Sequence, residues 1–405
     1  MDWILDRAIQ DRSRSSGTRL FRPLRLAQRI AVLWYCIAIL GCSQNVESHI
    51  DLQRNQVASV IPGASMLPSS LALTRTGKPA IASVTSAPEY AIQYVEIGKP
   101  PEIVGSAGNA EHLEVALSLA FTPEDRPMIA YTDDRSGDLV LAERTPQGWI
   151  NETVDTAGQV GYFLSLAVDG SGQPHISYFD NTLNDTKYAY RETDGWRIET
   201  IDAEGQPGFH IPAGFTQLVL RCEPSPSECT TERPQVAYLA YRYKPYDGEL
   251  RFATRYDWGW YIETVDSATG AGGFPSLALD AEDKPWISYY RAGTWDYHSG
   301  ELRVAHRENG KWQVEAIDRS DNSGRFSDLA LSPARTPFVA YYAATHGDLR
   351  LAWRNGSHWQ TQMLATEGDV GAWVQLAIDK NDLVHMTYVD ADERTTKLSV
   401  FVAPH

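Results

Sequence analysis

Aromatic side chains with polar neighbours occur in two predicted loops that have no counterpart elsewhere in the chain. Trp295, Tyr297 and His298 lie in an insertion at residues 291–300, and Tyr246 lies in a second one at residues 243–247. Flat rings beside hydrogen-bonding groups are typical of pockets that bind sugar rings or peptide side chains. Because functional residues concentrate in loops carried by a rigid scaffold, we predict that these four residues contact a ligand.

A second group of aromatic residues recurs along the chain, each close to a glycine at a predicted loop end. As further candidate ligand contacts we take Phe163, His210, Phe274, Trp373 and the loop carboxylate Asp133. Two interpretations are open for the recurring rings. They could line a binding site, or they could fill the space between structural repeats, which their regular recurrence favours.

The sequence contains no motif of the common catalytic classes. It lacks G-x-S-x-G, a phosphate-binding loop, a dinucleotide fingerprint and HExxH. Asp133, Asp134 and Asp138 lie close together, but without the spacing of a calcium-binding loop. We therefore expect no metal ion and no cofactor, and we favour a protein that binds over one that catalyses.

The elements that must position these residues are short β-strands. Within residues 273–318, four segments alternate apolar and polar side chains, and turns rich in Gly, Asn, Asp and Pro separate them. A period of two indicates strands. This stretch is predicted to form one four-stranded antiparallel sheet.

The same pattern recurs with a period near 47 residues. A tryptophan opens the fourth strand in five units: Trp149, Trp196, Trp260, Trp312 and Trp359. Aligning the first strands as well gives seven units, which begin near residues 67, 113, 161, 211, 273, 325 and 372. Seven four-stranded units predict an all-β fold, a seven-bladed β-propeller over residues 56–405.

The two ends of this repeat array are complementary. The seventh unit stops after its third strand, while residues 56–61 (QVASVI) form a spare strand before the first unit. Added to the last blade, this strand would close the ring and leave no unpaired edge. We predict that it does so.

The repeat, with its Gly-x-Trp turn between third and fourth strands, resembles sialidase-like and other Asp-box-type bacterial propellers over residues 56–405. The Asp box itself, Ser-x-Asp-x-Gly-x-x-Thr-Trp, is absent. The resemblance implies a possible sialidase-like site, which needs three arginines converging on a carboxylate. The candidate arginines recur at the end of the third strand in five units, so we predict structural roles for all five: Arg144, Arg191, Arg255, Arg307 and Arg354.

The N-terminal segment has the architecture of an export signal. Four arginines precede the apolar run 30–40, and Gly41-Cys42-Ser43 follows. Ile39-Leu40-Gly41-Cys42 resembles a bacterial lipobox, which implies a lipoprotein signal peptide at 1–41, lipidation of Cys42 and a tether at 42–55. Serine at position 43 implies sorting to the outer membrane. An ordinary signal peptide or an uncleaved anchor is the alternative.

The overall charge and the cysteine content restrict the partners. A formal net charge of −16 argues against nucleic acid and against adhesion to anionic lipid headgroups. Cys222 and Cys229 are the two cysteines outside the N-terminal segment, and in an exported protein they are expected to form a disulfide.

Three classes of function fit these features. The leading one is a lipid-anchored propeller at the cell envelope that binds a glycan or a protein through its loop face. The second is an enzyme on the same scaffold, a sialidase-like glycoside hydrolase or a polysaccharide lyase. The third is a non-catalytic scaffold subunit of an envelope complex. The fold alone does not choose among them.

Overall fold

The computed structural model describes residues 57–86, 90–108, 116–203, 215–223, 225, 229, 231–241, 248–293 and 298–404. The described residues form 28 β-strands, β1–β28, and contain no helix. Among them no helix could therefore cross a membrane. The strands belong to one compact unit, Leu52–His405. The predicted signal peptide at 1–41, the tether and Cys42 lie outside the described residues.

The first three blades follow one another along the chain. Blade 1 contains β2 (Ala64–Leu73), β3 (Pro79–Thr85), β4 (Ala91–Glu96) and β5 (Glu102–Ser106). Blade 2 contains β6 (Leu117–Phe121), β7 (Pro127–Asp133), β8 (Asp138–Thr145) and β9 (Gly148–Asp155). Blade 3 contains β10 (Tyr162–Val168), β11 (Pro174–Asp180), β12 (Asp185–Glu192) and β13 (Gly195–Asp202).

The next three blades repeat this order. Blade 4 contains β14 (Thr216–Glu223), β15 (Thr231–Tyr241), β16 (Gly248–Tyr256) and β17 (Gly259–Asp266). Blade 5 contains β18 (Gly273–Leu279), β19 (Pro285–Ala292), β20 (Gly300–Glu308) and β21 (Lys311–Asp318). Blade 6 contains β22 (Ser323–Leu331), β23 (Pro337–Ala343), β24 (Asp348–Asn355) and β25 (His358–Ala365).

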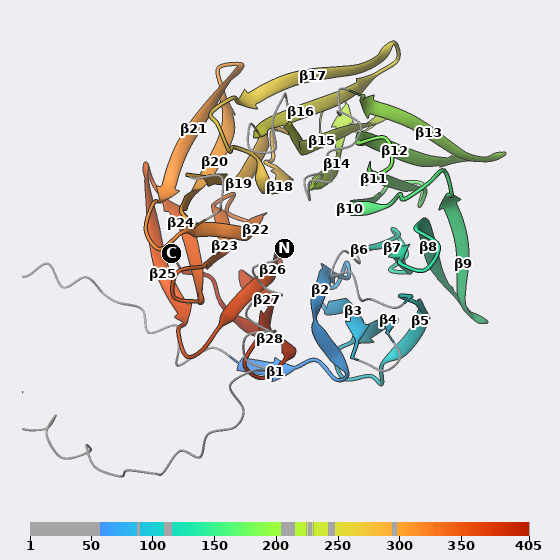
Figure 1. Ribbon diagram of the computed structural model, residues 1–405, viewed down its shortest axis with the longest axis horizontal. Coiled ribbons are helices and arrows are strands. Elements are labelled where there is room, and N and C mark those ends of the chain that lie inside the picture. The colour runs from blue at the N-terminus through green and yellow to red at the C-terminus, as the bar shows by residue number, and fades with distance from the viewer. Residues whose placement is uncertain are drawn as a thin grey trace, which may run out of the picture. The chain divides into compact units, whose positions relative to one another are not determined.

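Blade 7 joins the two ends of the described chain. It contains β26 (Val370–Ile378), β27 (Leu383–Asp390), β28 (Thr395–Val402) and, on the outside, β1 (Val57–Val60). β1 pairs antiparallel with β28, with Val57 opposite Val400 and Val60 opposite Lys397. The all-β, seven-bladed propeller is therefore confirmed, and so is its closure by the N-terminal strand (Figure 1).

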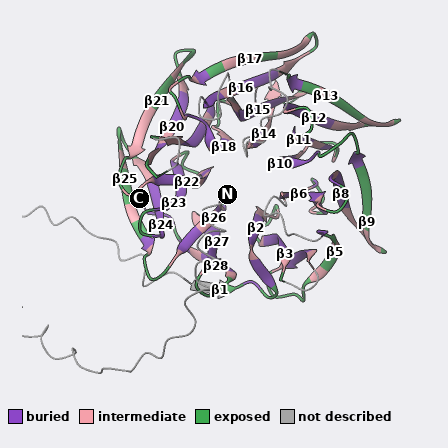
Figure 2. Ribbon diagram, viewed as in Figure 1, coloured by how far each residue is buried: buried purple, intermediate pink, exposed green. Residues whose placement is uncertain are grey.

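Each blade runs from an inner strand at the central channel to an exposed outer strand (Figure 2). Loops between second and third strands lie on the same face as the connections between blades. The amide of Val160, in a connection, donates to the carbonyl of Gly137 in the β7–β8 turn, for example. The hairpins between third and fourth strands lie at the opposite end, because neighbouring strands are antiparallel.

Buried tyrosines of the second strands connect neighbouring blades. Alternation along these strands turns one face to the adjacent blade, where the tyrosine side chain is buried. Each phenol donates a hydrogen bond of 2.7–2.9 Å to an aspartate that ends the outer strand of the preceding blade: Tyr178 to Asp155, Tyr238 to Asp202, Tyr289 to Asp266 and Tyr341 to Asp318.

The recurring arginines form a second set of contacts between blades. Each one pairs with a glutamate on the preceding blade: Arg144 with Glu102, Arg191 with Glu152, Arg255 with Glu199, Arg307 with Glu263 and Arg354 with Glu315. The fourth-strand tryptophan adds an indole N–H to the same glutamate in three of them, as from Trp260 to Glu199 at 3.0 Å. These contacts confirm the predicted structural role of the arginines.

Candidate functional site

Four inner strands begin with a bulge that turns an aromatic side chain toward the channel. Phe163, Phe274, Phe326 and Trp373 have φ values of 49°, 49°, 52° and 53°, and the pairing with the second strand shifts register at each of them. A left-handed conformation costs an L-residue roughly 1–2 kcal/mol. Packing by the surrounding blades must hold these bulges, and such strain concentrates at functional positions.

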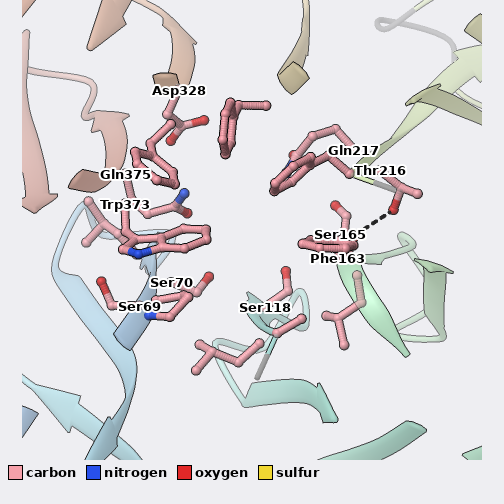
Figure 3. Close-up of a pocket in the computed structure, with 18 of the residues that line it drawn as sticks. Ser69, Ser70, Ser118, Phe163, Ser165, Thr216, Gln217, Asp328, Trp373 and Gln375 are labelled. Carbon is pink, nitrogen blue, oxygen red and sulfur yellow. Dashed lines mark hydrogen bonds between the residues drawn. The ribbon is translucent and has the colours of Figure 1, made fainter. Parts of the chain in front are cut away.

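These rings form an aromatic arc, which we define as Phe163, Phe215, Phe274, Phe326 and Trp373, one from each of blades 3–7. Successive ring centroids lie 4.3, 4.5, 4.5 and 4.3 Å apart, and the rings are tilted by 43–58°. Figure 3 shows the first and last residues of the arc, Phe163 and Trp373, on opposite sides of the central pocket. The repeat alignment puts Pro68 and Ala116 at the same position in blades 1 and 2, so the arc has a gap there.

The arc surrounds a central cavity of about 300 Å³. Residues two positions further along the inner strands form its polar floor: Ser70, Ser118, Ser165, Gln217, Asp328 and Gln375. The serines also connect neighbouring blades of the propeller. Ser70 Oγ accepts the amide of Leu119 in the next blade at 2.9 Å, and Ser118 and Ser165 repeat this contact.

Asp328 places a carboxylate where four other blades have serine. Its Oδ2 accepts the amide of Leu376 at 2.6 Å, and its Oδ1 accepts the Ser276 hydroxyl at 2.6 Å and its neighbour's amide, that of Leu329, at 3.1 Å. Desolvation raises the pKa of Asp328 to about 6, and these hydrogen bonds only partly oppose it. Among the described residues that line the cavity, Asp328 is the only ionisable one.

The structure distributes the predicted ligand contacts unevenly. Phe163, Phe274 and Trp373 belong to the aromatic arc. Asp133 ends β7 away from the cavity lining, and its Oδ1 accepts the amide of Arg135 at 3.0 Å. His298 is exposed between β19 and β20. The remaining predicted contacts lie outside the described residues: His210, Tyr246, Trp295 and Tyr297.

Sequence reasoning did not select Phe215 or the polar floor. A signal for the floor was present, because the first strands align at one position that is serine in four units. Gln217, Asp328 and Gln375 are the departures from that serine. These larger polar side chains all line the cavity.

The two cysteines of the propeller lie in an interruption of the first hairpin of blade 4. Cys222 and Cys229 form a disulfide in blade 4, with their Cα atoms 4.9 Å apart. Glu232 lies close to both, and this is the group of described residues whose spacing could suit a metal ion. The two cysteine sulfurs of this group are already bonded to each other, so the group does not have the free thiolates that a metal ion would require.

No family model matches the sequence, and no curated protein matches it. Solved structures are similar in fold. They include a polysaccharide lyase of family PL25, an ulvan lyase bound to a GlcA(1-4)Rha3S saccharide, at 10% identity and a TM-score of 0.60, over 84% of this chain and 95% of that one.

Two further structures show the same architecture. Virginiamycin B lyase from Staphylococcus aureus with quinupristin has 8% identity and a TM-score of 0.55, over 86% of this chain and 99% of that one. The polysaccharide lyase Uly1 has 7% identity and a TM-score of 0.52, over 85% and 91%. At these identities the similarity shows the propeller fold.

Proposed function

We propose that this protein is an exported, lipid-anchored β-propeller that binds a glycan in its central cavity. The aromatic arc above a polar floor carries the proposal. The C–H faces of a pyranose ring pack against aromatic rings, whose faces are electron-rich. The hydroxyl groups of the same sugar can exchange hydrogen bonds with the serine, glutamine and aspartate side chains below.

Charge favours a neutral glycan as the ligand. The described residues of the cavity lining include one acid and no base, and the chain carries a net charge of −16. A uronate or a sulfate would have to approach Asp328 without a lysine or arginine to neutralise it. Like charges in a partly desolvated site repel strongly. The ulvan lyase, by contrast, holds an acidic, sulfated saccharide.

A polysaccharide lyase is the second candidate, because two of the similar structures are polysaccharide lyases. Elimination requires a base positioned beside the sugar, and glycoside hydrolysis requires two carboxyl groups in one pocket. The described lining offers one carboxyl group, itself engaged in three hydrogen bonds. Incubation with uronate-containing polysaccharides, followed by ultraviolet absorbance of unsaturated products, separates the candidates: product release favours the lyase.

Export and anchoring form a separate part of the proposal. The basic and apolar N-terminal segment ending at Cys42 motivates it, and the disulfide supports an oxidising compartment. Mass spectrometry of the mature N-terminus is the test. The expected result is a lipidated Cys42 at the first position, and an unmodified Cys42 within a longer chain would contradict it.

Calorimetric titration of residues 43–405 with neutral oligosaccharides tests the binding site. We expect Trp373→Ala to weaken binding of the tightest ligand by about tenfold or more, because an aromatic contact and its buried area are lost. Ile150→Ala is the matched control, since Ile150 is 59% exposed on the outer strand β9. If Trp373→Ala binds every saccharide as the wild type does, the cavity is not the site.

A further inference from the structure

The hairpin between β16 and β17 in blade 4 carries two exposed aromatic side chains and a third that is partly exposed. Trp258, at the turn, is 71% exposed, and Tyr261, on the outer strand, is 49% exposed. Tyr256 precedes the turn and pairs with Gly259 across it. We call Tyr256, Trp258 and Tyr261 the hairpin platform. Large exposed rings cost solvation free energy, and a group of them indicates a binding surface.

The platform is held in place by a network beneath it. The rings of Tyr256 and Trp258 are parallel within 2°, with centroids 5.4 Å apart, and Tyr261 meets Trp258 edge-on at 6.5 Å. The Arg233 guanidinium lies 4.6 Å from the centroid of the Tyr256 ring. Both carboxylate oxygens of Glu223 accept hydrogen bonds from Arg233 at 2.8 Å.

This ion pair fixes the stack before any ligand arrives. The hydrogen bonds from Arg233 hold the pKa of Glu223 below its ordinary value, so the pair stays charged at neutral pH. Arg233 also donates to the carbonyl of Arg255 at 2.7 Å, which ties it to the strand next to Tyr256. A surface that is rigid before binding loses less conformational entropy on binding.

The platform departs from the repeat, so the fold does not require it. The residue two positions before the fourth-strand tryptophan is Gln147, Asp194, Gly310 or Ser357 in blades 2, 3, 5 and 6, and Trp258 in blade 4. Blade 4 also carries the disulfide, which joins the end of β14 to the segment before β15. Both features lie at the blade end opposite the aromatic arc.

We propose that the hairpin platform is a second saccharide-binding site, which takes one or two pyranose units of a neutral glycan. Two parallel rings, with the Arg233–Glu223 ion pair beneath them and the exposed Asp257 between them in the sequence, match a sugar, which presents C–H faces and hydroxyl edges together. A stable protein interface needs about 800 Å² from each partner and has few charges at its core. The net charge of −16 disfavours nucleic acid.

The site is independent of the central cavity, so its test uses the cavity variant as the starting point. Mobility is measured in native gels cast with soluble xylan, mannan or β-glucan, and titrations use the corresponding hexasaccharides. In the Trp373→Ala background, we expect retardation to persist and Trp258→Ala to weaken it by about tenfold. Trp258→Tyr should retain most of it, and Gln147→Ala, at the equivalent turn of blade 2, should leave it unchanged.

Each outcome tests one of the two proposed saccharide sites. If Trp258→Ala alone removes binding while Trp373→Ala does not, the platform is the saccharide site and the cavity proposal fails. If Trp258→Ala changes nothing in the Trp373→Ala background, or if no saccharide retards that background, the platform proposal is overturned. It is equally overturned if the protein dimerises, or binds single-stranded DNA, in a way that Trp258→Ala abolishes.

Discussion

At the scale of single residues, Asp328 is the most informative departure from the repeat. Four other blades place serine at this position. In each of them the serine oxygen accepts a hydrogen bond from a backbone amide of the next inner strand. Asp328 keeps that contact, to Leu376, but adds a partly buried negative charge. A change that the scaffold does not need, at the floor of the cavity, points to a role in ligand binding.

This charge makes a pH-dependent prediction. The pKa of Asp328 is raised to about 6 in the folded protein, against about 3.9 in the unfolded chain. The folded state therefore binds the extra proton between these values, and the contribution of Asp328 to stability falls as pH rises through this window. We expect Asp328→Ser to gain up to about 3 kcal/mol of unfolding free energy relative to wild type between pH 4 and pH 7.

Urea unfolding of both proteins across this pH range measures the effect. Because other titrating groups are shared, the difference between the two curves isolates Asp328. A difference that stays constant with pH would contradict the raised pKa.

The aromatic arc could be predicted from the sequence only in part. Recurrence drew attention to Phe163, Phe274 and Trp373, but two interpretations stayed open, because spacing does not say where a ring points. The left-handed backbone decides this, and bulky residues adopt it rarely enough that no sequence rule would assign it four times. The polar floor was missed because its serines look like ordinary strand residues.

At the scale of elements, the outer-strand glutamates link neighbouring blades, because they accept hydrogen bonds from arginine and tryptophan side chains of the next blade. Desolvation alone would raise the pKa of Glu199, but hydrogen bonds from Arg255 and Trp260 outweigh it and lower the pKa. We expect Glu199→Ala to reduce the unfolding free energy by about 2 kcal/mol, since two partly buried side chains, Arg255 and Trp260, lose the carboxylate that accepts their hydrogen bonds.

Glu192→Ala is the matched control for Glu199→Ala. Glu192 pairs with Arg197 at 3.0 Å on the same blade, but both side chains are more than 40% exposed. Exposed ion pairs contribute little. Equal losses of stability in chemical denaturation for the two variants would contradict the linking role of Glu199.

The closing strand offers a second prediction at this scale. Removing residues 56–61 deletes β1 and exposes the edge of β28, together with the core residue Leu398. We expect a loss of roughly 1 kcal/mol for each backbone hydrogen bond removed, and aggregation through the open edge. A truncation of residues 43–50, which leaves β1 intact, should melt like the parent in calorimetry. Equal melting of the two truncations would show that β1 does not close the ring.

The order of strands within each blade could be predicted, because it depends on local sequence patterns that recur in each repeat. Period-two alternation, turn residues and the recurring tryptophans were enough to give seven blades and the closing strand. The hairpin platform was not visible in the same way. Trp258 lies two residues before Trp260 in the sequence. Only the structure shows that the Trp258 ring is exposed, whereas the Trp260 indole donates a hydrogen bond to Glu199.

At the scale of the whole molecule, the propeller is an acidic ring whose central cavity carries one charge among its described lining residues. A neutral ligand in such a cavity predicts binding that is insensitive to ionic strength. Raising the salt concentration from about 0.1 M to about 1 M shortens the Debye length from about 10 Å to about 3 Å. The dissociation constant of the tightest saccharide should change by less than about twofold. A strong dependence on salt would indicate a charged ligand.

A crystal structure of residues 43–405 with the tightest neutral saccharide tests the central claim most directly. We predict a pyranose ring against the aromatic arc, in contact with Phe274, Phe326 or Trp373, with a hydroxyl group within hydrogen-bond distance of Asp328 or Gln375. Saccharide density elsewhere on the molecule, with the central cavity empty of sugar, would contradict the account.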